Sequence, residues 1–195
     1  MKESMSCAKT VAWNLLSSDF KKKIHEEWKE SGNFGLHIHC PEGGTPKDGP
    51  SAGAAITTAI LSCLTNIPVN NEIAMTGEID IHGKVHAIGG LDAKLEGARI
   101  AGAKLVMVPK ENEHALKQAV NHIRTPASSP RKSSLSLENG VDSDNSDEKY
   151  FDESNELINS PWEGMRVIMV EDIFQVLKHA LVENDTEFVD YARIL

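Results

Sequence analysis

The stretch that decides the fold runs from residue 46 to residue 65 and reads PKDGPSAGAAITTAILSCLT. Its first part is a tight turn rich in glycine and proline, and from Ser51 to Thr65 nearly every side chain is apolar or small. A helix that is apolar all round is buried in a protein. We therefore expect a buried helix over residues 51–65, with Ser51 delivered to its start.

Outward from this helix, the flanking segments alternate between helical and extended patterns. Apolar residues at helical spacing predict helices at residues 1–16, from the cap Asp19 to Trp28, at 91–101 and after the cap Asp172. Alternating or short apolar runs predict strands at 35–40, 72–81, 84–88, 105–108 and 166–170, with a hairpin turn at His82-Gly83. This order of elements predicts a mixed α/β fold.

Residues 125–160 differ in composition from the rest of the chain. They contain nine serines and eight acidic residues against three basic ones. Such a segment cannot bury enough apolar surface to offset the entropy of ordering. We expect one domain over residues 1–195 with a disordered insert at about 125–160. The insert is either a tolerated surface insertion or a regulatory segment with a phosphosite at Ser129-Pro130.

Charge and hydropathy exclude several classes of partner. The 195 residues include 20 Lys and Arg against 29 Asp and Glu, a net charge of −9, which does not suit a nucleic-acid-binding chain. No run approaches the roughly 20 apolar residues of a membrane span, and no signal peptide precedes the first helix. The three cysteines, Cys7, Cys40 and Cys63, are typical of buried thiols in a reducing compartment. We expect a cytoplasmic protein without nucleic-acid or membrane partners.

Ser51 has a setting that suits a nucleophile. A turn before a helix can expose the hydroxyl, and the free amides at the helix start favour a developing oxyanion. The alternative is that Ser51 only caps the helix. A phosphate-binding loop is excluded, because such a loop needs Lys directly before the Ser or Thr, and Pro50 stands there without an amide hydrogen.

Four blocks of sequence, taken together, resemble the proteolytic domain of Lon proteases. The signature block is Pro41 to Gly53, PEGGTPKDGPSAG. The other blocks, in register, are Met1-Lys2-Glu3-Ser4, Ala74-Met75-Thr76-Gly77-Glu78-Ile79, and Gly89-Gly90-Leu91 followed by Lys94. They cover residues 1 to about 116, and the segment at about 166–182 matches more weakly. The resemblance implies the mixed α+β Lon proteolytic fold, with small sheets packed with helices, and a serine endopeptidase with a Ser-Lys dyad.

The resemblance assigns Ser51 as the nucleophile and Lys94 as its base. A serine hydroxyl is a weak nucleophile until a neighbouring base takes its proton. A lysine can do so only as the neutral amine, so its pKa must fall from roughly 10.4 to about 7–8. Burial beside apolar groups has this effect. We expect Lys94 to lie in apolar surroundings together with Ala98 and Ala101 of the same helix face.

Three further positions support the dyad in this reading. The resemblance implies that the Thr76 hydroxyl orients the lysine amine, although a β-branched strand residue is the alternative. It also implies that Asp48 pairs with the lysine in inactive forms, and the alternative there is a turn former. The oxyanion donors would be the amide of Ser51 and that of Gly49 or Asp48, because Pro50 cannot donate.

The resemblance also implies partners. The substrate would be an unfolded or flexible polypeptide bound as an extended strand, and the chain would form a homo-oligomer, the hexameric ring of this ATP-dependent family. The family's ATPase module is absent from this chain, so we expect no cofactor here and a separate ATPase module as a partner. Strands that the family carries upstream of Met1 are also absent, which predicts an open sheet edge and self-association. The alternative function is a catalytically silent Lon-like fragment used for assembly or binding.

Four histidines invite a metal hypothesis. His37 and His39 form one pair, and His82 and His86 form another. No cysteine pair with zinc spacing accompanies them, and no sequence feature brings the two pairs together. We therefore expect no metal site.

Overall fold

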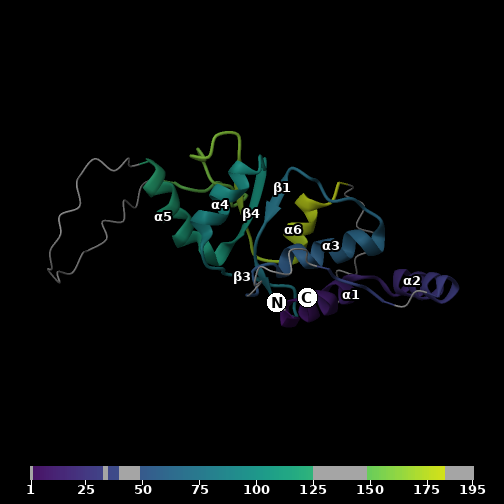
Figure 1. Ribbon diagram of the computed structural model, residues 1–195. Coiled ribbons are helices and arrows are strands. Elements are labelled where there is room, and N and C mark those ends of the chain that lie inside the picture. The colour runs from purple at the N-terminus through teal and green to yellow at the C-terminus, as the bar shows by residue number, and fades with distance from the viewer. Residues whose placement is uncertain (1, 33–34, 40–48, 125–148, 183–195) are drawn as a thin grey trace.

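The structure, a computed structural model, describes residues 2–32, 35–39, 49–124 and 149–182 (Figure 1). In chain order its elements are α1 (Lys2–Leu15), α2 (Ser18–Ser31), α3 (Gly53–Thr65), β1 (Ile73–Met75), β2 (Glu78–Ile79), β3 (Val85–His86), α4 (Leu91–Ile100), β4 (Leu105–Pro109), η1 (Lys110–Asn112), α5 (Glu113–Arg124), β5 (Arg166–Val170) and α6 (Ile173–Ala180). None of the helices in these ranges is long and apolar enough to cross a bilayer.

The main sheet has three parallel strands in the order β1-β4-β5. Ile73 pairs with Leu105, and Met107 pairs with both Met75 and Ile168, so β4 is the central strand. Parallel neighbours need a crossover connection. The β2–β3 hairpin and α4 lie between β1 and β4 in the chain, and α5 lies between β4 and β5. The second sheet is the antiparallel hairpin of β2 and β3, as the sequence predicted around His82-Gly83.

The main sheet separates two apolar clusters. Along β4, Met107 belongs to the cluster formed with α1, α3 and α6, whereas Val106 and Val108 belong to the cluster formed with α4 and α5. This alternation follows from the two-residue period of a strand. Figure 1 shows α3 and α6 on one side of β4, and α4 and α5 on the other. The predicted mixed α/β fold, with small sheets packed with helices, is confirmed.

The helix over the deciding stretch is buried as expected, with one difference at its start. Gly53, Ala54, Thr57 and Leu61 are buried, and α3 packs along α1. The helix begins at Gly53 with Ala52 as its N-cap, so Ser51 lies in the turn before it. The side chain of Asp172 caps α6 as predicted. In α2, however, Ser17 rather than Asp19 is the N-cap, and Ser17 Oγ accepts a hydrogen bond from the amide of Phe20.

Residues 35–39 and the cysteines differ from the sequence prediction. Residues 35–39 form no strand in the described structure. Leu36 and Ile38 instead pack against the cluster that contains α1 and α3, so the alternating pattern reflects packing on a helix. Of the cysteines expected to be buried thiols, Cys7 is half-buried, Cys63 is exposed and Cys40 lies outside the described residues.

The last part of the expected disordered insert is ordered. Phe151 forms an isolated bridge with Leu157, and Glu156 forms another with Ile168 of β5. Leu157 is only 4% exposed and belongs to the cluster on the α5 side of the sheet. The expected boundary at Ser160 is therefore wrong, because a few apolar side chains there bury despite the polar composition. Residues 125–148 lie outside the described residues.

Candidate active site

Ser51 is held by the connection between β1 and β2. Its carbonyl accepts hydrogen bonds from the amide of Gly77, at 2.9 Å, and from the hydroxyl of Thr76, at 3.2 Å. The amide of Ala54 in turn donates to the carbonyl of Gly77 at 3.1 Å. The half-buried Ser51 is therefore fixed through its backbone carbonyl, and its side chain takes no part in these hydrogen bonds.

Two glycines allow α3 to approach the hairpin this closely. A Cβ atom on Gly53 would lie 2.8 Å from the backbone nitrogen of Ile79, which is closer than real contacts allow. A Cβ atom on Gly77 would collide with the side chain of Val85 in β3. Both residues belong to the sequence blocks quoted above, but their packing role could not be read from the sequence alone.

Lys94 comes to Ser51 from α4. This helix begins at Leu91 after Gly90, whose left-handed φ of 68° suits glycine, and the amide of Lys94 donates to the Gly90 carbonyl at 3.2 Å. The Lys94 Nζ atom lies 3.2 Å from Ser51 Oγ, although the two residues are 43 positions apart. The structure thus brings together the two residues that the sequence singled out.

The surroundings of Lys94 differ from the expectation. Its side chain is exposed, not surrounded by apolar groups. The buried stripe of α4 consists of Leu91, Leu95 and Ala98. Lys94 precedes Leu95 by one residue, which turns it about 100° away from that stripe. Ala101, expected on the same face as Lys94, is exposed as well.

The structure describes two of the three supporting residues, Thr76 and Gly49. Thr76 is buried, at 8% exposure, and its hydroxyl contacts the Ser51 carbonyl, while the described residues show no hydrogen bond from it to Lys94. Gly49 is exposed and has a left-handed φ of 92°. Asp48 lies outside the described residues. No described residue accepts a backbone hydrogen bond from the amide of Gly49 or of Ser51.

A side-chain amide that the sequence reading missed holds the segment leading to α4. Asn112 of η1 is buried, at 7% exposure. Its Oδ1 accepts from the amide of Ile88 and its Nδ2 donates to the carbonyl of Ile88, each at 2.9 Å. The adjacent Glu111 accepts from the amide of Ala87 at 3.0 Å. No sequence pattern distinguishes such an asparagine from a surface residue of the same loop.

His86 lies between two carboxylates of different elements. Its Nε2 is 3.0 Å from Asp80 Oδ2, and its Nδ1 is 3.2 Å from Glu111 Oε1. The hydrogen bond to Asp80 raises the pKa of His86, with Glu111 adding to the effect against partial burial. Partial burial would raise the pKa of Asp80, but hydrogen bonds from His86 and from the amides of Lys84 and His82 outweigh it and lower that pKa.

His86 is thus engaged with carboxylates, and the two histidine pairs do not meet. Within the described ranges, no group of three His, Cys, Asp or Glu side chains is arranged to hold a metal ion. His37 and His39 lie beside α3, where residues 36–39 line a shallow pocket with Ile56 and Cys63.

Comparison with known proteins identifies the same family that the sequence blocks resemble. Residues 1–129 match the Lon protease (S16) C-terminal proteolytic domain. The chain is 48% identical over 124 residues to the Lon protease of Buchnera aphidicola subsp. Acyrthosiphon pisum, covering 63% of this chain and 15% of that protein. It is 47% identical over 124 residues to the Lon protease of Haemophilus influenzae, covering 64% of this chain and 15% of that protein. A Lon protease homolog of Acanthamoeba polyphaga mimivirus is 46% identical over 113 residues, or 58% of this chain and 11% of the homolog.

The chain therefore belongs to the family of Lon protease (S16) C-terminal proteolytic domains. The matched region of this chain spans about 15% of the length of the two bacterial relatives.

Proposed function

We propose that this chain is a serine endopeptidase that hydrolyses unfolded or flexible polypeptides through a Ser51–Lys94 dyad. The observation that carries the proposal is the 3.2 Å separation of Lys94 Nζ and Ser51 Oγ. This lies at the upper end of hydrogen-bond reach, as is common when no substrate is bound. Membership of the Lon family supports the same reaction class.

The proposed reaction follows acyl-enzyme chemistry. The neutral Lys94 amine takes the proton of Ser51 Oγ while the oxygen attacks the carbonyl carbon of the scissile peptide. The resulting ammonium returns that proton to the nitrogen of the leaving amine when the C–N bond breaks, which leaves an ester on Ser51. A water molecule, deprotonated by the same amine, then attacks the ester, and Ser51 Oγ regains a proton as the acid product leaves.

The backbone around Ser51 supplies the complementary charge. The amides of Gly49 and Ser51 donate to no acceptor among the described residues, and both precede the first turn of α3. Free amides at a helix start carry partial positive charge, which stabilises an oxyanion in the transition state. In this proposal Thr76 and Gly77 act as positioning residues, because they hold the Ser51 carbonyl and so aim its amide.

The exposure of Lys94 sets a condition on this mechanism. A lysine in contact with water is stabilised in its charged form, which cannot take a proton. Removing water favours the neutral amine, which can. We infer that bound substrate and neighbouring copies of the chain in a homo-oligomer, the hexameric ring of the family, exclude water from Lys94. A separate ATPase module would deliver unfolded substrate, and no cofactor takes part in peptide hydrolysis by the dyad itself.

A serine-directed fluorophosphonate tests the nucleophile together with peptide turnover. The chain should be labelled at Ser51 and should cleave a flexible peptide, and Ser51→Ala should abolish both without changing the melting temperature. Ser18→Ala, at an exposed position on α2, is the matched control and should retain both activities. Turnover that persists in Ser51→Ala rules out the assignment.

A second candidate is a catalytically silent module used for assembly or binding. The observation that favours it is the exposure of Lys94, because water favours the charged form of a lysine and the charged form cannot take a proton. In that case the unmodified chain, assembled to its stable oligomer, would resist the fluorophosphonate. Labelling of the assembled chain at Ser51 excludes this candidate.

A further inference from the structure

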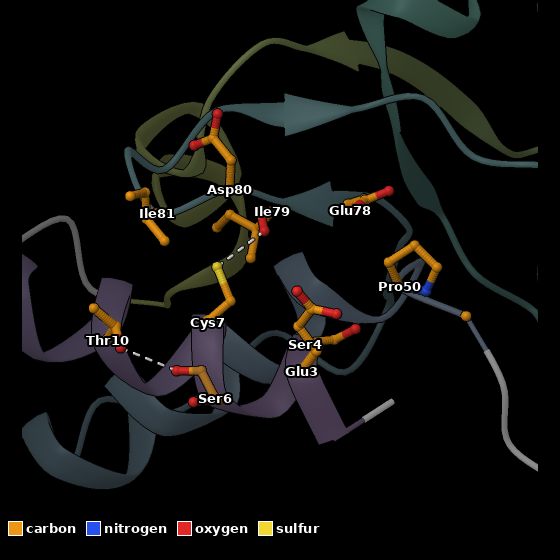
Figure 2. A pocket seen from close by; sticks show the side chains of 11 residues that line it. Glu3, Ser4, Ser6, Cys7, Thr10, Pro50, Glu78, Ile79, Asp80 and Ile81 are labelled. Carbon is orange, nitrogen blue, oxygen red and sulfur yellow. Dashed lines mark hydrogen bonds between the residues drawn. The ribbon is translucent and has the colours of Figure 1, made fainter.

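A groove of about 670 Å³ lies between α1 and β2 and ends beside the candidate nucleophile (Figure 2). Its walls are formed by the groups Glu3, Ser4, Ser6, Cys7 and Thr10 of α1, by Glu78, Ile79, Asp80 and Ile81 around β2, and by Gly49 and Pro50. Figure 2 shows Glu3 and Ser4 at the end of α1 that lies nearest to Pro50 and Glu78. Because Pro50 directly precedes Ser51, a chain lying in this groove would pass close to the dyad.

All the charge that the described residues place along this groove is negative. Glu3, Glu78 and Asp80 contribute carboxylates, and none of the lining residues in the described ranges is a lysine, arginine or histidine. Asp80 is engaged with His86 of β3, whose Nε2 lies 3.0 Å from Asp80 Oδ2. Glu3 and Glu78, by contrast, form no ion pair with any residue that the structure describes. Each of the two opposite walls of the groove therefore presents a carboxylate that has no counterion in the part of the chain that the structure describes.

The thiol of Cys7 lines the groove, and its pKa depends on the carboxylates around it. Its Sγ donates to the carbonyl of Ile79 at 3.2 Å, across the gap between α1 and β2 (Figure 2). Burial raises the pKa of Cys7, and the charges of Asp80, Glu3 and Glu78 raise it further. The same three carboxylates thus oppose a negative charge at this point and would favour a positive one.

The remaining surface suits the stem of a long cationic side chain. Ile81, at 63% exposure, is one of the most exposed large apolar residues described, and Pro50 is exposed as well. Lysine and arginine lay their methylene stems along apolar surface and keep the charged head among polar groups. Here the stem would lie on Ile81 or Pro50, and the head would reach Glu3 or Glu78.

We propose that this α1–β2 groove binds the part of the polypeptide substrate next to the scissile bond and that Glu3 and Glu78 select a lysine or arginine side chain there. The inference rests on the proposed peptidase function. It goes further in naming the substrate feature and the residues that read it. Glu3 and Glu78 are specificity residues in this proposal and take no part in bond breaking.

Binding to an inactive chain tests the groove independently of catalysis. In the Ser51→Ala background, we would measure fluorescence anisotropy with flexible peptides that differ only by lysine or norleucine at each position in turn. Lysine should bind about tenfold more tightly at one or two positions, a factor that corresponds to about 1.4 kcal/mol. The double variant Glu3→Gln/Glu78→Gln should bring the ratio close to one and leave norleucine binding unchanged.

A charge-matched double variant controls for the overall field. Glu26→Gln/Glu27→Gln removes the same charge from exposed positions on α2, outside the groove, and should preserve the lysine preference. The preference should also fall when salt shortens the Debye length from about 30 Å to about 3 Å. A lysine preference that survives Glu3→Gln/Glu78→Gln, or that is absent from the starting chain, overturns the inference.

Three further outcomes distinguish this inference from the peptidase proposal and from self-association. Cleavage that depends on Ser51 but shows no lysine preference sinks the groove assignment and leaves the peptidase intact. Lysine-selective binding without any Ser51-dependent cleavage supports the groove assignment and contradicts the peptidase proposal. If a second copy of the chain occupies the groove instead, sedimentation will show self-association that Glu3→Gln/Glu78→Gln abolishes while peptide binding stays unselective, and this too overturns the substrate assignment.

Discussion

The side-chain amide of Asn112 pairs with both backbone groups of Ile88, its oxygen and its nitrogen each making a 2.9 Å hydrogen bond. Ile88 is followed by Gly89-Gly90 and then by α4, which carries Lys94. This one side chain therefore fixes the starting point of the helix that brings the candidate base to Ser51.

We predict that Asn112→Ala will reduce the rate of peptide turnover more than the affinity for substrate, because it loosens the start of α4 without touching the groove. Leaving the two Ile88 groups unpaired should also cost about 1–3 kcal/mol of stability. Asn112→Asp offers a sharper readout. Only its protonated carboxyl can both donate and accept, so its melting temperature relative to Asn112→Ala should rise as the pH falls. A pH-independent difference would contradict the paired geometry.

Lys94→Arg should be as inactive as Lys94→Ala, with a loss of roughly 10²–10⁴-fold in turnover. Arginine keeps the positive charge but stays protonated at neutral pH, so it cannot act as the base. Lys104→Arg, at an exposed position before β4, is the conservative control and should keep full activity. Substantial turnover by Lys94→Arg would mean that Lys94 only stabilises charge.

Gly53→Ala should destabilise the protein by about 1–3 kcal/mol and reduce labelling of Ser51. The added methyl would meet the backbone of Ile79, which cannot move aside as a flexible side chain could. Gly97→Ala is the matched control, because Gly97 lies inside α4 with open space around its Cβ position. It should stabilise the protein by roughly 0.5–1 kcal/mol. Urea unfolding of both variants measures the contrast, and equal effects would contradict the close approach of α3 and β2.

The His86–Asp80 pair predicts a window of extra stability between about pH 4 and pH 6.5. The pKa of His86 is raised from 6.5, so its contribution is complete below 6.5 and is lost as the pH rises through the raised value. The pKa of Asp80 is lowered from 3.8, so its contribution is complete above 3.8 and is lost as the pH falls through the lowered value. Between these limits only the imidazolium can donate from both ring nitrogens, to Asp80 and to Glu111.

The effect should be modest, about 0.5–1 kcal/mol, because His86 and Asp80 are each about a third exposed, at 31% and 33%. Lys84, which pairs with Glu111 at 3.0 Å, partly offsets the two carboxylates. Unfolding free energies of the protein and of His86→Gln, measured across this range, should converge above the window. A difference that stays constant with pH would show that the pair contributes packing alone.

Leu157→Ala should cost about 2–5 kcal/mol, the usual penalty for emptying a buried leucine site. Residues 149–160 would then be part of the domain despite their polar composition. Deletion of residues 125–148 should shift the melting temperature little, since loop length affects closure entropy weakly. If Leu157→Ala changes the free energy of unfolding by only a few tenths of a kcal/mol, residues 149–160 belong to the insert, as the sequence predicted.

Much of the site could be predicted because its residues lie in short, specific blocks. The apolar and small side chains of residues 51–65 predicted a buried helix. The resemblance of the four blocks to the Lon proteolytic domain singled out Ser51 and Lys94, whose side chains lie 3.2 Å apart in the structure. Strands β4 and β5 could be predicted for a different reason, since a strand buried on both faces is a continuous apolar run in the sequence.

Other features depended on relations across the chain that local patterns do not contain. Lys94 has buried neighbours in sequence, yet a single-residue offset on α4 turns it to solvent. The alternation at Leu36 and Ile38 was real, but it reflects contact with the core cluster and not a strand ladder. The pairing of Asn112 with Ile88 joins residues 24 positions apart and leaves no trace in composition or period.

The central position of β4 has a consequence for how the protein is made. β4 ends at Pro109, but its second neighbour, β5, is complete only at Val170, about 60 residues later. At the usual pace of synthesis, a nascent chain would wait about 3 to 12 seconds with one edge of its central strand uncovered. During that interval the edge is a template for any other extended chain. The risk of misassembly in a cell should therefore depend on translation speed and chaperone supply, and slow codons placed before β5 should lower the yield of folded protein.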